Sequence, residues 1–175
     1  NYIAPLGQDV LFSTEKTELG RNFANKIWNA GRFLLINTDE IKIDENLLDK
    51  HKDFVDDWID SKFQSTLNQL NNSLDKFEIN SASKLIYSYV WNDFCDWYVE
   101  ICKGRFQSSD PAEKKAALRF IGESFLNILK LLHPLVPFIV IGTARHKLSA
   151  PVIHTAHCFQ LLPDIVYVFD STVIW

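Results

Sequence analysis

The chain has 175 residues, of which 47% are hydrophobic and 23% are charged, and its formal net charge is −4. This composition is ordinary for one globular domain and excludes a wholly basic nucleic-acid binder, although a local basic surface is compatible with it. No apolar stretch is long enough to cross a bilayer, so we expect no membrane contact. The chain has no methionine and no basic region followed by an apolar one at its start. We therefore expect a segment of a longer protein without a secretory signal.

The first third of the chain contains one clear helical pattern. Residues 1–12 include a proline and a glycine, which indicates an irregular lead-in. Ser13 or Thr14 can cap a helix that runs to about Asn37. The acidic stretch 38–52 then indicates a connector with a few turns.

Two further helices are expected in the middle of the chain. The first covers residues 53–76. The second starts after Asn80, a favourable capping residue, and runs over residues 81–103, where Gly104 can end it. Cys95 and Cys102 lie in its apolar pattern, and with Cys158 they form no CxxC pair. An odd number of cysteines without such a pair favours free, buried thiols over a disulfide framework or a zinc finger.

The last helix has the clearest start. Asp110 can cap it, a proline occupies its first turn, and a glutamate follows three residues after the cap, so the helix should run to about Leu132. Four amphipathic helices in sequence predict an all-α fold, an up-down helical bundle over residues 13–140. Apolar residues at steps of three and four supply the expected core. They are Tyr87, Trp91, Phe94, Tyr98 and Ile101 in the third helix, and Leu118, Ile121, Phe125, Ile128 and Leu132 in the fourth.

The first helix carries three stripes, because an α-helix advances about 100° per residue. The apolar stripe, which should dock on the bundle, is Phe23, Ile27, Ala30 and Leu34. The second stripe is Asn22, Lys26, Asn29 and Phe33, and the third is Arg21, Asn25, Trp28 and Arg32. Cations can contact phosphates, amides can read base edges, and aromatic rings can stack on unpaired bases. By geometry alone, however, such a face is more often a solvated surface.

The acidic residues and cysteines indicate no catalytic site. Asp56, Asp57 and Asp60 form an acidic helical face, which we expect to be solvated. Asp93 and Asp96 are expected to cap a helix or to pair with basic residues. No pattern places a histidine beside Cys95, so we predict no catalytic residue in this segment.

The run Gly20–Phe33 (GRNFANKIWNAGRF) resembles the segment that opens the anticodon-binding domain of valyl-tRNA synthetases, which are class I aminoacyl-tRNA synthetases. The third predicted helix resembles the family's third helix, with its W-x-x-F-C-D-W-Y core in Asn80–Glu100. The run Leu131–Phe138 (LLHPLVPF) resembles the turn that ends the fourth helix. Pro5–Val10 is similar to the junction with the catalytic core, to which we assign residues 1–12. The related isoleucyl and leucyl enzymes lack the R-N-F-x-N-K-x-W-N run.

The resemblance implies a cytoplasmic valine–tRNA ligase, which in its complete form uses ATP and Mg²⁺. In it, this domain would hold the anticodon stem-loop of a valine tRNA beside the catalytic core of the same enzyme. The family contacts anticodon bases at the positions of Lys26, Asn29 and Phe33, so we expect Phe33 to stack on a base and the other two to bind base edges. We expect Arg21 and Arg32 to contact the RNA backbone. The complete expected tRNA-binding set is Arg21, Asn22, Asn25, Lys26, Asn29, Arg32 and Phe33.

The chain departs from the family in two ways. The HIGH and KMSKS motifs that hold ATP are absent, and no glycine-rich phosphate loop replaces them. We therefore expect no cofactor in this segment and no amino-acid activation by it alone. After Phe138 the family's closing sequence is also missing. Residues 141–175 form an atypical tail whose last part, 164–175, is β-branched and aromatic, which favours a strand or an unpacked apolar segment. A frameshift, gene decay or an unrelated fusion would each explain it.

The tail also gathers His146, His154, His157, Cys158 and Asp164, and histidine and cysteine are zinc ligands. Their spacing matches no familiar site, so we expect incidental histidines and no metal site. Two functions remain open. One is anticodon recognition within a valine–tRNA ligase. The other is a non-catalytic helical interaction module, or a decayed synthetase fragment, that does not bind tRNA.

Overall fold

A computed structural model describes residues 13–38 and 52–137. In chain order the helices are α1 (Thr14–Thr38), α2 (Phe54–Asp75), α3 (Ile79–Ser88), η3 (Tyr89–Tyr98), α4 (Val99–Phe106) and α5 (Pro111–Leu132). No strand occurs among these described residues, and the predicted all-α bundle is confirmed. The junction assigned to residues 1–12, most of the 38–52 connector, the β-prone tail and its histidine cluster lie outside the described residues.

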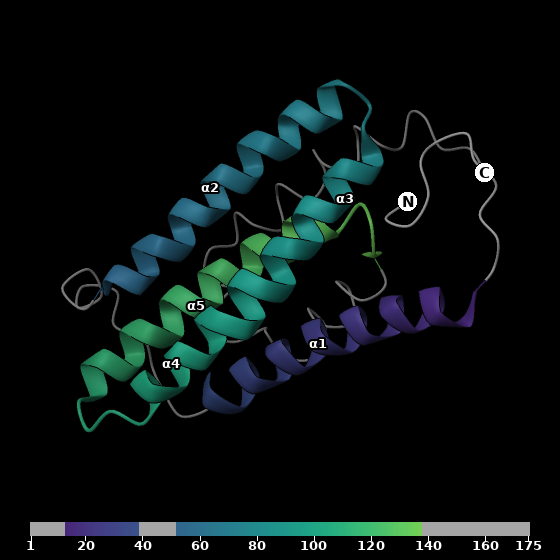
Figure 1. Cartoon of the computed structure of the whole chain (residues 1–175). Helices are drawn as coiled ribbons and strands as arrows, with labels where there is room; N and C mark the ends of the chain where they lie inside the picture. The colour runs from purple at the N-terminus through teal and green to yellow at the C-terminus, as the bar shows by residue number, and fades with distance from the viewer. Residues whose placement is uncertain (1–12, 39–51, 138–175) are drawn as a thin grey trace.

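The helices α3, η3 and α4 follow one another without a break and form one long central helix whose middle is π-helical. Short turns join α2 to this helix and join it to α5, so consecutive helices run antiparallel. Figure 1 shows α1 and α2 on opposite sides of the layer formed by the central helix and α5. Accordingly, α1 contacts η3 and α5, whereas α2 contacts α3, η3 and α5. None of the described helices combines the length and apolar composition that a membrane span requires.

Side-chain caps fix the starts of α2 and α5. Asp53 caps α2, and its backbone N–H donates to the Asp56 carboxylate at 2.9 Å, which completes a capping box. As predicted, the Asp110 carboxylate caps α5 by accepting a hydrogen bond from the backbone N–H of Ala112 at 2.9 Å. Glu113 does not complete a capping box there, because its carboxylate accepts a bond from the Ser108 hydroxyl at 2.5 Å. Both helices therefore begin where their sequences indicated.

The turn between α2 and α3 ends α2 with a Schellman motif. The N–H of Glu78 donates to the Ser73 carbonyl at 2.8 Å, and the N–H of Phe77 donates to the Leu74 carbonyl at 2.9 Å. This pattern places Phe77 in the left-handed region, with φ of 57°, where glycine is the favoured residue. The side chain of Phe77 is 79% exposed, so its packing contributes little to offset the strain of this backbone conformation.

The predicted ends of the third helix were wrong at both sides. Asn80 does not cap it, because the helix already begins at Ile79. Gly104 does not end it either, because α4 continues to Phe106. Glycine inside a helix costs only about 1 kcal/mol. The burial of Arg105 and Phe106 against the bundle outweighs that cost.

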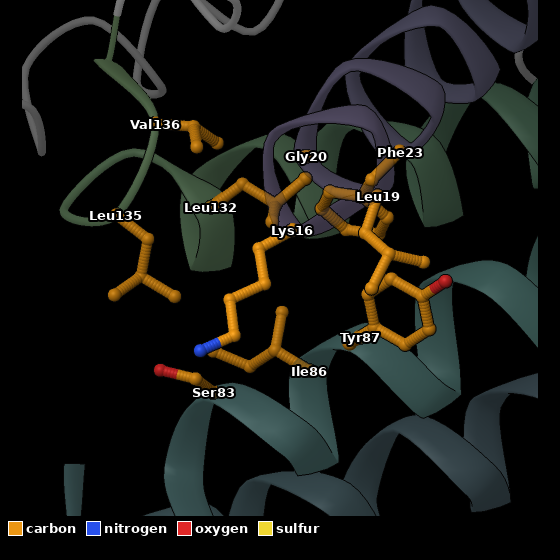
Figure 2. A pocket seen from close by; sticks show the side chains of 10 residues that line it. All are labelled: Lys16, Leu19, Gly20, Phe23, Ser83, Ile86, Tyr87, Leu132, Leu135 and Val136. Atoms are coloured by element: carbon orange, nitrogen blue, oxygen red, sulfur yellow. The ribbon is translucent and has the colours of Figure 1, made fainter. Parts of the chain in front are cut away.

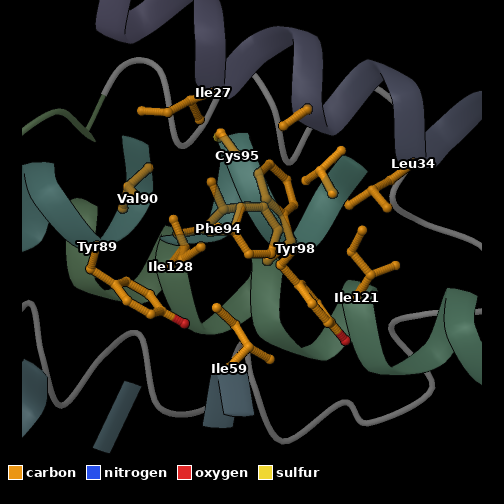
Figure 3. Close-up of a cluster of buried hydrophobic side chains, with 14 of the residues drawn as sticks. Ile27, Leu34, Ile59, Tyr89, Val90, Phe94, Cys95, Tyr98, Ile121 and Ile128 are labelled. Atoms are coloured by element: carbon orange, nitrogen blue, oxygen red, sulfur yellow. The ribbon is translucent and has the colours of Figure 1, made fainter. Parts of the chain in front are cut away.

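The core lies between α1, the central helix, α2 and α5. Figure 3 shows Ile27 and Leu34 pointing from α1 toward Phe94 and Tyr98, while Ile59 approaches from α2. The predicted docking stripe of α1 is confirmed, with Phe23 half-buried at its edge and the other three residues buried. The predicted core of α5 is confirmed throughout, since every one of its five residues is buried.

The predicted core of the central helix was only partly right. Phe94 and Tyr98 are buried, but Tyr87 and Trp91 are half-buried and Ile101 is 40% exposed. The prediction assumed a regular α-helix, whereas the bonds of a π-helix run from residue i to i+5 and make a wider turn. One series of buried residues along this helix follows steps of four: Ala82, Ile86, Val90, Phe94, Tyr98, Cys102 and Phe106. In an α-helix each such step drifts by about 40° around the axis, and the wider turn of η3 offsets that drift.

A buried ion pair joins α2 to the end of the central helix. Asp56 is 1% exposed, and both of its carboxylate oxygens lie 2.9 Å from Nη1 of Arg105. The Tyr98 hydroxyl donates a further bond to Asp56 at 2.6 Å. Burial disfavours the charged guanidinium, but the charge and hydrogen bonds of Asp56 outweigh this effect and raise the pKa of Arg105. The prediction of a solvated acidic face was therefore wrong for Asp56, because the start of α2 packs against the central helix there.

Candidate nucleic-acid interface

The third stripe of α1 faces solvent. Arg21, Asn25 and Arg32 are exposed, and Trp28 is also exposed by more than a third of its surface. Arg21 lies 3.8 Å from Glu18, one turn earlier on the same exposed helix, and such surface pairs contribute little to stability. The two arginines are about three turns apart, so both are accessible to a polyanion along one side of α1.

The second stripe of α1 is divided between solvent and the bundle. Asn22 and Asn29 are exposed, whereas Lys26 and Phe33 are half-buried against the central helix. The Phe33 ring lies 5.5 Å from the ring of Phe106, and Nζ of Lys103 lies 5.7 Å from its centre. Part of the Phe33 ring is thus covered by α4, and the rest is open beside a cation.

Lys26 is held by two side chains of η3. Its ammonium forms an ion pair with Asp96 and lies 3.8 Å from the centre of the Trp91 ring. Trp91 in turn stacks on Tyr87, with ring centres 5.5 Å apart, and Tyr87 stacks on Phe23 of α1 at 4.9 Å. Of the two roles that the sequence left open for Asp96, capping a helix or pairing with a basic residue, the structure shows the pairing, but neither Asp96 nor Trp91 was placed at the interface. Only the contact between α1 and η3 brings them there.

The other acidic residues of the expected faces also have basic partners. Asp93 lies 3.5 Å from Nζ of Lys62, which matches pairing and not helix capping, the other role left open for it. Asp57 and Asp60 are exposed and lie 2.7 and 3.1 Å from Nζ of Lys52. The three aspartates of these pairs lie on α2 and η3, away from the exposed stripe of α1.

The chemistry available at this surface is hydrogen bonding, charge attraction and stacking. Burial raises the pKa of both Cys95 and Cys102 to about 12, so both thiols are neutral and unreactive at ordinary pH. Within residues 13–38 and 52–137, no three His, Cys, Asp or Glu side chains gather into a group that could hold a metal ion.

A hollow of about 250 Å³ lies between the start of α1, α3 and the end of α5. Figure 2 shows Lys16 extending along it toward Ser83, with Leu132 and Leu135 on one side and Tyr87 on the other. Its lining is almost entirely apolar. The hollow therefore lacks the converging polar groups that a site for a small polar substrate needs. It shares Phe23 and Tyr87 with the aromatic stack behind Lys26.

Comparison with known proteins identifies the family. The family described as the anticodon-binding domain of tRNA ligase matches residues 56–160, which is more than half of the chain. The chain belongs to this family. The match includes α2 from Asp56 onward, the central helix and α5, and thus the ion pair of Asp56 with Arg105 and the η3 residues that hold Lys26.

Curated relatives of this anticodon-binding domain are named valine–tRNA ligases. Those of Bacillus thuringiensis subsp. konkukian and Bacillus subtilis are 40% and 39% identical to it over 140 residues. The Clostridium acetobutylicum relative is 39% identical over 145 residues. Each alignment covers 80% of this chain but only 16% of the relative, so the chain spans about one sixth of the length of the proteins that it matches.

Proposed function

We propose that this anticodon-binding domain recognises the anticodon stem-loop of a valine tRNA as part of a valine–tRNA ligase. In its complete form that enzyme would join valine to its tRNA in the cytoplasm, with ATP and Mg²⁺ bound by a separate catalytic core. The observation that carries the proposal is the surface of α1, which presents two exposed arginines beside exposed asparagines, a partly open phenylalanine and a fixed lysine. The family membership and the names of the relatives support it.

The proposed roles follow from exposure and charge. Arg21 and Arg32 contact phosphates, because both are exposed and one charged face of α1 can follow an RNA backbone. Phe33 stacks on an unpaired base with the part of its ring that Phe106 leaves open. Asn29, which is exposed and lies between Arg21 and Phe33 in the sequence, contacts the edge of a base.

The remaining members of the proposed surface lie nearer the start of α1. Asn22 and Asn25 are exposed and contribute hydrogen bonds to the same RNA. Lys26 contributes a hydrogen bond to a base edge. We also propose residues 13–140 as the folded unit that carries this surface, with residues 1–12 as its junction to the catalytic core.

The decisive variant is Phe33→Leu, which keeps an apolar side chain against Phe106 but removes the aromatic face. Stacking of a base on an aromatic ring contributes about 1–3 kcal/mol, so the affinity for a valine anticodon stem-loop should fall about five- to 150-fold. Fluorescence anisotropy with a labelled synthetic stem-loop measures this change. The matched control is Phe54→Leu, since Phe54 is 78% exposed and lies at the start of α2, on the opposite side of the central layer.

Salt dependence tests the proposed backbone contacts. Each phosphate contact to single-stranded RNA changes the slope of log affinity against log salt by about 0.7. Arg32→Gln should therefore make the slope shallower by about that amount, whereas Phe33→Leu should leave it unchanged. If the unaltered chain binds a scrambled anticodon loop as tightly as the valine loop, the proposed recognition is wrong and the binding is non-specific. If it binds neither loop, a helical interaction module becomes the better explanation.

A further inference from the structure

The π-helical segment η3 places two residues on one side of the helix that an α-helix would separate. Trp91 and Asp96 are five residues apart, and both contact the ammonium of Lys26. Five residues of an α-helix advance about 500°, which leaves the two side chains about 140° apart. In a π-helix the backbone bonds themselves join residues five apart, so such residues lie one above the other. The unusual backbone of η3 is therefore what assembles the Lys26 contacts.

These contacts restrict what Lys26 can do. An ammonium has three N–H donors and no acceptor. Asp96 takes one donor, the Trp91 ring covers one side of the group, and the lysine side chain is only 23% exposed. A lysine on a surface is normally mobile and loses rotamer entropy when it binds. Here that entropy is already lost before a ligand arrives.

The charges around Lys26 also select the kind of ligand. Asp96 is 48% exposed, so an approaching phosphate meets a carboxylate as well as the ammonium, and the net charge of the pair is zero. A neutral pair gives little counterion release with a phosphate. It still offers a directional N–H to an acceptor atom on a base edge, such as a carbonyl oxygen or a ring nitrogen. The pair is thus better suited to reading a base than to holding a backbone.

We propose that Trp91 and Asp96 are positioning residues that fix Lys26 as a preset hydrogen-bond donor for an acceptor atom on an anticodon base. This inference rests on the proposed function and deepens it, because it assigns Lys26 to base reading while Arg21 and Arg32 hold the backbone. The aromatic stack of Phe23, Tyr87 and Trp91 keeps the ring in place beneath the ammonium.

The test is Asp96→Asn in the full chain, with Asp93→Asn as the matched control. Asp93 lies in the same π-helical segment and also pairs with a lysine, Lys62, but not with one of α1. Two labelled probes are used: a valine anticodon stem-loop and the same stem-loop with a scrambled anticodon. In Asp96→Asn the ratio of the two affinities should fall about tenfold, the size expected for losing one well-placed contact of a charged group to a base. The salt slope should not become shallower, because Asp96→Asn removes no cation, and Asp93→Asn should keep the ratio.

A second measurement reports the geometry of Lys26 without RNA. In the NMR spectrum of the free chain, the terminal methylene protons of Lys26 should be shifted upfield by the Trp91 ring, and Asp96→Asn should remove this shift. An unchanged affinity ratio in Asp96→Asn, an equal rise in affinity for both RNAs, or a persistent upfield shift would each overturn the inference. If the unaltered chain does not prefer the valine stem-loop, the proposed function fails. The upfield shift then shows separately whether the lysine is held as described.

Discussion

The buried pair of Asp56 and Arg105 gives the sharpest test of what holds the bundle together. The substitution Asp56→Ala removes the acceptor of the Arg105 guanidinium, of the Tyr98 hydroxyl and of the Asp53 N–H. The guanidinium would stay buried without its counter-charge, and breaking a buried pair in this way costs about 3–5 kcal/mol. Domains of this kind are stable by only about 5–15 kcal/mol in total. We therefore expect Asp56→Ala to lose a large fraction of the free energy of unfolding.

The assay is urea unfolding followed by far-UV circular dichroism, with the midpoint and the slope fitted together. Asp57→Ala is the control, because Asp57 lies next in the same helix, is exposed and pairs only with Lys52 in the described contacts, so it should cost less than about 1 kcal/mol. The double variant Asp56→Leu/Arg105→Met should recover much of the loss, since apolar residues of similar volume often replace a buried pair without cost. A loss below about 1 kcal/mol in Asp56→Ala would refute the reasoning, because removing the counter-charge of a buried guanidinium should cost more than that.

Three further predictions concern backbone strain, thiols and packing. Phe77→Gly should raise the free energy of unfolding by about 0.5–1 kcal/mol, because glycine adopts the left-handed region without strain and the exposed ring packs little. In a Cys158→Ser variant, iodoacetamide at pH 8 should label Cys95 and Cys102 only as fast as the chain unfolds. Their pKa of about 12 lies above the ordinary value of 9.0, so the stability they contribute is complete below pH 9.0 and is lost as the pH rises toward 12. Ile128→Ala should cost about 2–5 kcal/mol in urea unfolding, since that side chain is fully buried.

Each of these predictions has its own contradicting result. A destabilised Phe77→Gly would mean that the exposed ring makes contacts worth more than the backbone strain. Rapid labelling of the two thiols in the native chain would mean that the core around the central helix opens locally. If Ile128→Ala unfolds at the same urea concentration as the unaltered chain, α5 does not pack as described.

Helix positions were predictable from the sequence because their signals are local. The start of α5 is set by Asp110 and the following proline, and the docking stripe of α1 is set by spacing alone. The burial of Asp56 was not predictable, because its partner Arg105 lies 49 residues away and the surrounding aspartates are indeed solvated. Ile101 was wrongly assigned to the core because no local sequence pattern predicts a π-helix. The apolar residues at steps of four were a sequence signal that could have indicated it.

The candidate site also has a part that was predictable from the sequence and a part that was not. The exposed stripe with Arg21 and Arg32 follows directly from helical periodicity. The half-buried state of Lys26 and Phe33 does not, because it depends on which side chains of η3 and α4 face α1. Trp91 was expected in the core because an aromatic residue at helical spacing usually lies there. Trp91 is instead half-buried at the edge of the core, where its ring stacks on Tyr87 and contacts the ammonium of Lys26.

The π-helical segment also determines which changes of length the central helix can accept. A π turn contains about one residue more than an α turn, so η3 resembles an α-helix that has absorbed an insertion without changing the direction of its flanks. Deleting the exposed Asn92 should let one turn close as an α turn while Tyr87 and Arg105 keep their orientations. Deleting the exposed Lys84 would instead rotate everything after it by about 100° and carry Arg105 away from Asp56. Natural variation in the length of this helix should therefore be confined to the ten residues of η3.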